Sequence, residues 1–383
     1  MKNCPIYYKS LFSSTASQIN VDLWGESVDA FDKGEHMKSL HLLFDYINAD
    51  LRPKYGNADG TEFHIPHGSI IVNISIKDGE CKVFAPFLEV NPSAVVPLLR
   101  QVASLNFNNM DLAQIYLKED RLNIEYSCKA NEVHPYKMYC LFKEICDTGD
   151  KYDDEYVTKF GAKRIYEPIV TPFAASKAET VWQTVQKILA DAFEYINYLE
   201  GKRLYSLAWD VAAITLRQID YYTRPQGQLR NDLADGIASM HGKNIPIAEL
   251  LGHGKVFMKT WQDMDKAQFI ADLYETQTFT PDKRRTSLQS IQEKFEREHG
   301  LTKENMANSN YINVALGILF VFYDAYYYNN VQDDISAVMV DAMEKSSGKP
   351  WEESAKILAA ALNKIMDGEL KVKKGSFFSR LFK

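Results

Sequence analysis

The sequence lacks any apolar run long enough to cross a lipid bilayer. The longest such run, Val314 to Tyr323, falls well short of the roughly 20 apolar residues that a transmembrane helix needs. We therefore interpret it as a buried helix of a globular core. The N-terminal residues include Lys2 and Lys9 but no apolar segment of the kind found in a secretory signal peptide. These two absences predict a cytoplasmic protein.

Cysteine is scarce and shows no recognisable spacing. The five cysteines are an odd number and include no CxxC pair, so neither a disulfide framework nor a zinc site is expected. We predict that Cys81, Cys128, Cys140 and Cys146 are reduced and fill small apolar spaces in the interior.

An excess of positive charge is also missing. The formal net charge is -7, whereas a nucleic-acid-binding protein needs basic side chains to neutralise phosphates, so this class of partner is excluded. A hydrophobic content of 46% with 25% charged residues is typical of a globular protein. A chain of 383 residues is long enough for two domains with separate cores.

The common catalytic motifs are absent as well. The sequence contains no phosphate-binding loop, no GxGxxG, no HExxH and no GxSxG. His64 and His67 flank Pro66, which keeps the segment extended, and no third ligand is evident. We expect surface or hairpin-flanking histidines, no metal, no cofactor and no catalytic residue.

One acidic group leaves an alternative open. Asp232 and Asp235 lie within one helical turn, close to Arg230, and facing helices can hold a metal ion in this way. The alternative function is therefore a metal-dependent hydrolase or transferase with its site in the helical half. Acidic residues near the start of a helix are, however, favoured by the helix dipole alone.

The first half of the chain shows two strand pairs. Apolar residues alternate with polar ones from Ile70 to Lys77 and from Cys81 to Phe87, on either side of Asp78-Gly79, a dipeptide that suits a two-residue hairpin turn. Ala113 to Leu117 and Leu122 to Cys128 form a second such pair across Glu119-Asp120.

Helical spacing surrounds these strands. It covers residues 26–47, Val95 to Leu105, and a stretch from Pro135 that extends to Phe160 if Gly149 does not break it. Pro97 makes the start of the second of these helices uncertain.

The order from Val95 to Tyr126, a short helix that closes on Leu105-Asn106 and is followed by two strands, resembles the YbjN family and the wider type III secretion chaperone-like fold. The resemblance covers residues 24–160 and rests on element order and apolar pattern. It implies an α+β domain that forms dimers and holds an extended segment of a client protein. It implies no catalytic residues.

The second half reads as an all-α domain. Its helical stretches follow one another after the prolines at 168 and 172, and they include residues 181–199, 204–214, 254–275, 284–298, 303–328, 333–344 and 352–366. We predict an α+β domain over residues 1–165, a helical domain over 173–370 and a tail over 371–383. The predicted function is that of a non-enzymatic adaptor or chaperone-like protein that grips partner proteins through the α+β domain.

Aromatic residues crowd two helix ends in the helical half. Tyrosine has a wide apolar ring with a polar tip, which suits a partly exposed interface as well as a packed helix whose hydroxyls reach the surface. The candidate interface residues are Tyr221, Tyr222, Tyr326, Tyr327 and Tyr328.

The tail differs in charge from the rest of the chain. Residues 371–383 carry five basic and no acidic side chains. If residue 376 caps a short helix, one side of it gathers the apolar residues, with basic residues beside them, which suits weak contact with anionic lipid at the inner face of the membrane or insertion into a partner's groove. The candidate contact residues are Phe377, Phe378, Arg380, Leu381 and Phe382.

Overall fold

The computed structural model describes residues 3–11, 22–281 and 283–370, without the side chains of Asp22 and Arg284. It divides into an α+β unit and a helical unit. Of the described residues, the α+β unit comprises 22–173 and 274–281, and the helical unit comprises 3–11, 174–273 and 283–370. The chain therefore enters each unit more than once.

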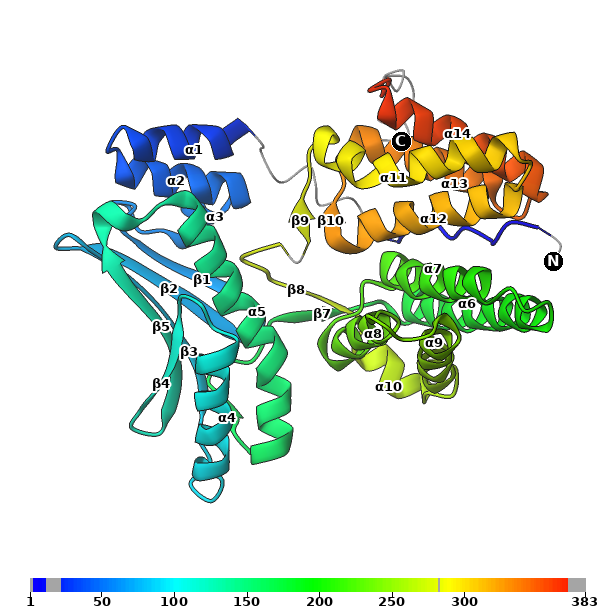
Figure 1. Ribbon diagram of the computed structural model, residues 1–383. Coiled ribbons are helices and arrows are strands. Elements are labelled where there is room, and N and C mark those ends of the chain that lie inside the picture. Colours follow the sequence, from blue (N-terminus) through cyan, green and yellow to red (C-terminus); the bar gives the residue numbers. More distant parts are fainter. Residues whose placement is uncertain (1–2, 12–21, 282, 371–383) are drawn as a thin grey trace. The chain divides into compact units, whose positions relative to one another are not determined.

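The α+β unit is built on an antiparallel sheet with strand order β1-β2-β3-β5-β4, to which β6 adds at the end of β3 (Figure 1). Its strands are β1 (Glu62–His67), β2 (Ile70–Lys77), β3 (Glu80–Glu89), β4 (Gln114–Lys118), β5 (Arg121–Lys129) and β6 (Lys163–Arg164), and a separate pair joins β7 (Val170–Pro172) to β8 (Tyr274–Thr276). Its helices are α1 (Asp22–Asp32), α2 (His36–Ile47), α3 (Leu51–Tyr55), α4 (Val95–Asn108), the 3-10 helix η2 (Ala130–Glu132) and α5 (Pro135–Phe160).

Local turn chemistry sets both predicted hairpins. Asp78 and Gly79 have positive φ values of 52° and 76°, as a two-residue turn of this kind requires, and they place Lys77 opposite Glu80. Glu119 has a φ of 56° at the second turn, between β4 and β5. The prediction of an α+β region with antiparallel hairpins followed by an all-helical region is confirmed.

Apolar side chains of α2 and α5 pack on one face of the sheet and form the core with it. Helix α4 contacts α5. Helix α5 runs unbroken through Gly149, although glycine weakens a helix. The reason lies in packing, because a β-carbon at Gly149 would come within 2.8 Å of the Ile70 Cδ1 atom of β2. The glycine lets α5 lie close against the sheet.

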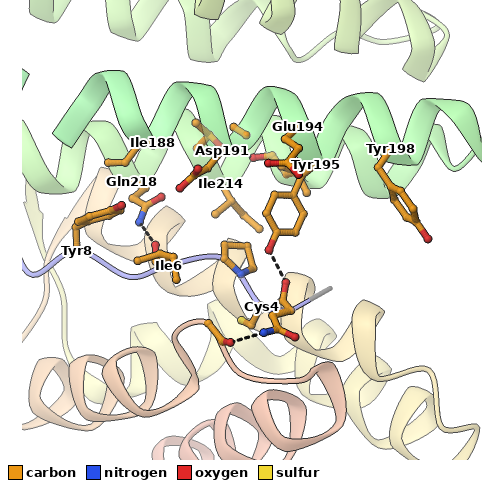
Figure 2. Close-up of a pocket in the computed structure, with 16 residues that line it drawn as sticks. Cys4, Ile6, Tyr8, Ile188, Asp191, Glu194, Tyr195, Tyr198, Ile214 and Gln218 are labelled. Carbon is orange, nitrogen blue, oxygen red and sulfur yellow. Dashed lines mark hydrogen bonds between the residues drawn. The ribbon is translucent and has the colours of Figure 1, made fainter. Parts of the chain in front are cut away.

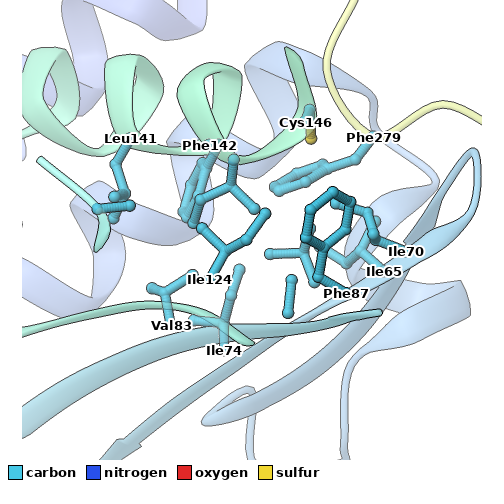
Figure 3. Packing of buried hydrophobic residues seen from close by; sticks show 14 of the residues in the cluster. Ile65, Ile70, Ile74, Val83, Phe87, Ile124, Leu141, Phe142, Cys146 and Phe279 are labelled. Carbon is cyan, nitrogen blue, oxygen red and sulfur yellow. The ribbon is translucent and has the colours of Figure 1, made fainter. Parts of the chain in front are cut away.

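A segment from far along the chain completes this core. Phe279, only 2% exposed, packs among Phe44 and Phe142, with a ring-centroid distance of 4.9 Å to Phe142 (Figure 3). The backbone N–H of Phe279 donates to Nδ1 of His67 (3.0 Å), and the N–H of Gly68 donates to the carbonyl of Gln277 (3.0 Å). Residues 274–281 are thus an integral part of the α+β unit.

The helical unit is centred on α7 and α12, which contact each other and carry its most buried faces. Its elements are α6 (Ala175–Gly201), α7 (Tyr205–Thr223), α8 (Gly227–Ser239), α9 (Ile247–Gln262), α10 (Lys266–Ala271), β9 (Arg284–Arg285), α11 (Leu288–Ala307), α12 (Tyr311–Tyr328), β10 (Asn329–Asn330), α13 (Asp333–Ser346) and α14 (Trp351–Met366).

Several predicted boundaries are wrong. The helix expected over residues 254–275 is two helices, because the Asp265 carboxylate accepts the N–H groups of Ala267 and Gln268 and so starts α10. The helix expected over 303–328 is likewise divided, at residues 308–310 between α11 and α12. Strand structure also continues beyond residue 173, in β8, β9 and β10.

The expected assignment of the chain to domains also differs from the structure in two places. Residues 3–11, placed by the sequence in the α+β domain, lie in the helical unit, where Cys4 is 1% exposed. Residues 274–281, placed in the helical domain, lie in the α+β unit. Neither segment has a pattern of its own that reveals where it packs.

Candidate functional site

Helix α4 of the α+β unit carries an exposed apolar stripe. Leu98, Val102 and Leu105 face the core, whereas Val96 and Phe107, on the opposite side of the helix, are 58% and 89% exposed. The helix begins at Val95, so Pro97 falls in its first turn, where a missing N–H costs nothing. We call Val96, Ala103 and Phe107 the α4 stripe; Leu99, beside it, is partly buried against the core.

The edge strand next to α4 is protected against pairing. The side-chain amide of Asn106 donates to the carbonyl of Ile115 (2.9 Å) and its oxygen accepts the Ile115 N–H (2.8 Å). The Glu144 carboxylate accepts the N–H groups of Asp111, Leu112 and Ala113 just before β4. Because these side chains occupy backbone groups that another strand would use, strand addition along β4 is disfavoured.

The sheet face that points away from the core is largely polar. His64 Nδ1 lies 2.6 Å from the Asn73 side-chain oxygen, and Lys118 pairs with Glu125 at 2.7 Å. Phe84, 42% exposed, stands between these polar neighbours. This is the pattern of a solvated face of an antiparallel sheet.

The two histidines examined as metal ligands lie on opposite faces of β1. His64 is exposed, whereas His67, the last residue of β1 before the turn to β2, flanks the hairpin and is only 2% exposed. Its Nδ1 atom accepts the Phe279 N–H, so Nε2 carries the proton and donates to Asp150 (3.1 Å). Among the described residues, no group of three or more His, Cys, Asp or Glu side chains is arranged to hold a metal ion.

The N-terminal residues occupy a groove of the helical unit (Figure 2). The Cys4 N–H donates to the Lys349 carbonyl (2.8 Å), the Gln218 side chain donates to the Ile6 carbonyl (2.8 Å) and the Tyr195 hydroxyl donates to the Asn3 carbonyl (2.6 Å). A cavity of about 460 Å³ adjoins this segment, and its lining includes Ile188, Asp191, Glu194 and Tyr198 of α6. The groove thus holds a peptide segment of the same chain.

The five candidate interface tyrosines have different surroundings. Tyr221 and Tyr222 are 8% and 4% exposed and contact the rings of Tyr7 and Tyr8 in the N-terminal segment. Tyr326 packs on Tyr221 at 4.7 Å between ring centroids. Tyr327 and Tyr328 pack edge to face on each other at 4.8 Å, and Tyr328 is 49% exposed. The sequence indicated these five tyrosines as candidate interface residues. It did not indicate that the chain's own N-terminal segment packs on two of them.

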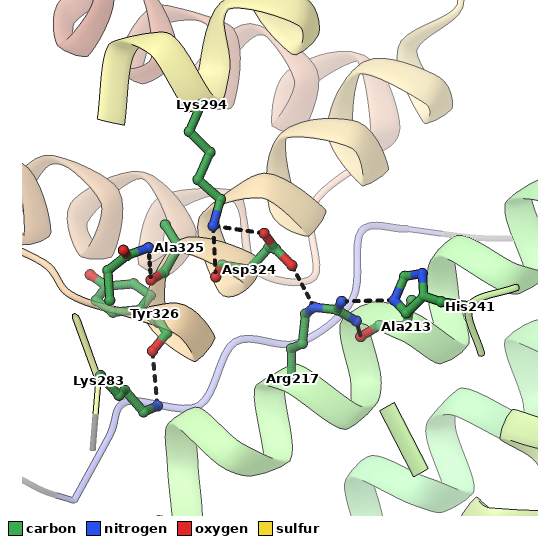
Figure 4. Close-up of polar contacts among 9 residues, drawn as sticks. Ala213, Arg217, His241, Lys283, Lys294, Asp324, Ala325 and Tyr326 are labelled. Carbon is green, nitrogen blue, oxygen red and sulfur yellow. Dashed lines mark hydrogen bonds and ion pairs between the residues drawn. The ribbon is translucent and has the colours of Figure 1, made fainter. Parts of the chain in front are cut away.

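A buried ion pair links α7 to α12 (Figure 4). Arg217 is 1% exposed, and its Nε donates to Oδ1 of Asp324 at 2.9 Å. Its other nitrogens donate to the Ala213 carbonyl (3.2 Å) and lie 3.2 Å from Nε2 of His241, whose pKa is lowered by burial and by the guanidinium charge. The guanidinium also lies 4.8 Å from the centre of the Phe320 ring.

Two lysines extend this network. Lys294 Nζ lies 2.9 Å from Oδ2 of Asp324, so this carboxylate serves two cations. Lys283 pairs with Asp220 at 2.5 Å and donates to the Tyr326 carbonyl at 2.8 Å. Each of the three cations is therefore paired with one of two carboxylates inside the unit, as expected of a structural network.

The acidic residues of the alternative enzyme function lie on α8. Asp232 accepts a hydrogen bond from Gln228 at 2.5 Å, four positions earlier on the same helix. A different carboxylate pair, unnoticed in the sequence, has altered acidity: burial raises the pKa of Asp210 to about 6, and burial with repulsion from Asp210 raises that of Glu298 to about 7. The signal that could have revealed Asp210 is its place in the apolar run of α7.

The prediction that the cysteines fill apolar space is wrong for Cys140, which is exposed on α5. Cys81 and Cys146 are buried, and Cys128 is half-buried. All five cysteines are free thiols.

The five candidate contact residues of the tail, Phe377, Phe378, Arg380, Leu381 and Phe382, lie outside the described residues. Within the described part of the chain, no helix combines the length and apolarity needed to span a membrane.

Comparison with known proteins gives no family assignment. No protein-family model matches the sequence, and no curated protein is similar to it at a significant level. The resemblance to the YbjN family and the secretion chaperones therefore stays a prediction.

Proposed function

We propose that the protein is a non-enzymatic, chaperone-like adaptor of the cytoplasm that binds partner proteins through its α+β unit. The observation that carries this proposal is the α4 stripe, with Phe107 at 89% exposure. Exposed apolar side chains that share one helix face are typical of surfaces that dock on another protein.

The chemistry of the stripe indicates the kind of partner. Burying one phenylalanine or valine side chain stabilises a complex by about 1.5–3 kcal/mol, so Phe107 and Val96 together give a modest, reversible affinity. Arg100 is exposed on the same helix beside them and adds a charge for an acidic group. The surface suits an apolar helix or an extended segment with an acidic residue.

Replacing Phe107 with serine is expected to weaken partner binding about ten- to a hundredfold while leaving the folded unit intact. The measurement is a pull-down from native cytosol with the tagged full chain, followed by titration of the proteins retained. Val256→Ser is the matched control, because Val256 is 70% exposed on α9 of the helical unit. Equal retention by wild type and both variants would contradict a role of the stripe.

Light scattering distinguishes a second copy of the chain from a different protein as the partner that binds the α4 stripe. The resemblance to secretion chaperones favours a homodimer, and the stripe is then covered by a second copy. In that case the wild type at tens of micromolar has twice the mass of one chain and Phe107→Ser has the mass of one. Monomeric mass for both proteins would remove the homodimer and leave a different protein as the partner.

We also propose a weak membrane contact for the tail, on the basis of sequence alone. Residues 371–383 combine five basic side chains with three phenylalanines and a leucine. A chain that ends at Lys374 is expected to co-sediment less with anionic vesicles than the full chain does, while recovery with neutral vesicles stays low for both. Equal recovery of the two forms with anionic vesicles would eliminate the contact.

A further inference from the structure

Cys81 and Cys128 lie directly opposite each other on neighbouring strands. They are register partners of β3 and β5, so their side chains point to the same face of the sheet. The Ala130 N–H donates to the Gly79 carbonyl (2.8 Å) in the same register, which places the cysteines in a hydrogen-bonded pair with a Cα separation of about 5.5 Å. This separation is within the range that a disulfide spans.

The two thiols differ in burial and in electrostatic surroundings. Cys81 is fully buried, whereas Cys128 is half-buried and within reach of solvent. A hydrogen bond from Cys81, together with the charge of Lys137 on α5, lowers the pKa of Cys128 to about 6 against the opposing effect of burial. The thiolate form of Cys128 is therefore favoured over that of Cys81, which makes Cys128 the better nucleophile of the pair.

An open hollow lies beside this pair. Its volume is about 750 Å³, and it is bordered by the N-terminal end of α2 and the β2–β3 turn. Ile76, the strand partner of Cys81, and Lys129, which follows Cys128, both line it. Neither cysteine lines the hollow, so a small disulfide reaches the pair at the solvent-accessible part of Cys128.

We propose that Cys81 and Cys128 form a reversible redox site, in which a low-molecular-weight disulfide of the glutathione type converts the two thiols into a disulfide that joins β3 to β5. The Cys128 thiolate attacks one sulfur of the small disulfide, whose other half leaves as a thiolate and takes up a proton. The Cys81 thiol then loses its proton and attacks the Cys128 sulfur of the mixed disulfide, releasing the second small thiol. Two protein thiols are oxidised and one small disulfide is reduced to two thiols.

The test exposes the full native chain to mixtures of reduced and oxidised glutathione, quenches with acid, blocks free thiols and maps tryptic peptides without reduction. Trypsin cuts after Lys77, Lys82, Arg121 and Lys129, so the two cysteines fall in separate short peptides that only a disulfide can join. We expect the linked pair to accumulate in the wild type and to disappear on treatment with excess reduced glutathione.

Single-cysteine variants show which cysteine carries out each step of the exchange. Cys140→Ser, which removes the exposed thiol of α5, should leave the linked pair unchanged. Cys81→Ser should stop the reaction at glutathione attached to Cys128, and Cys128→Ser should abolish linkage. The proposal is overturned if the native wild type yields only glutathione adducts, or if the linkage forms only after unfolding in urea.

Discussion

Replacing Phe279 with alanine is expected to lower the free energy of unfolding of the α+β unit by about 3–5 kcal/mol. The side chain is 2% exposed among Phe44 and Phe142, so its removal leaves a cavity where the surrounding rings cannot easily collapse. Urea unfolding of the full chain, with hydrogen exchange read on peptides from β2 and α5, measures the effect within this unit.

Gln277→Ala is the matched control for this prediction. Only the backbone carbonyl of Gln277 bonds to Gly68, and an alanine keeps that carbonyl. The control should therefore unfold at nearly the wild-type urea concentration. Wild-type stability of the Phe279→Ala protein would show that residues 274–281 contribute little to the core.

Replacing Asp324 with alanine is expected to destabilise the helical unit by about 3–5 kcal/mol, because it leaves the charge of Arg217 buried without a counterion. Arg217 is 1% exposed, and its Nε donates to Asp324 at 2.9 Å between α7 and α12, so the variant removes the carboxylate acceptor of a buried guanidinium. Urea unfolding followed by hydrogen exchange in α7 and α12 reports this loss.

Lys294→Ala tests the same network from its outer side. The Lys294 side chain is 29% exposed, so its pair with Asp324 is partly screened by solvent and its removal should cost about 1 kcal/mol or less. Arg217 keeps its partner in that variant. Equal losses for Asp324→Ala and Lys294→Ala would mean that burial of Arg217 does not set the cost.

The sequence predicted those parts of the fold that local chemistry decides. The Asp78-Gly79 turn fixes one hairpin, and apolar spacing located most of the helices. The predicted helix boundaries were wrong where one capping side chain decides where a helix begins, as Asp265 does for α10. The low helix propensity of glycine left undecided whether α5 continues through Gly149. The close approach of Ile70 explains why that position is a glycine.

Long-range packing could not be predicted. The Phe279 N–H and His67 are 212 positions apart, and nothing in residues 274–281 indicates that they leave the helical unit. The α4 stripe illustrates the same limit for the candidate site, because the spacing predicts a helix but not which apolar residues stay exposed. The pairing of Cys81 with Cys128 likewise depends on how two separate hairpins join into one sheet.

Because each unit is built from separate parts of the chain, its folding during synthesis cannot be completed until the last of those parts has been made. Asn3 bonds to Gly348, which is made 345 positions later. At about 5–20 residues per second, the N-terminal segment waits on the order of tens of seconds for this partner. The α+β unit also has to wait for Phe279, which is made only after much of the helical unit. Neither unit can therefore reach its final state while the chain is half-made, and nascent chains need protection during that interval.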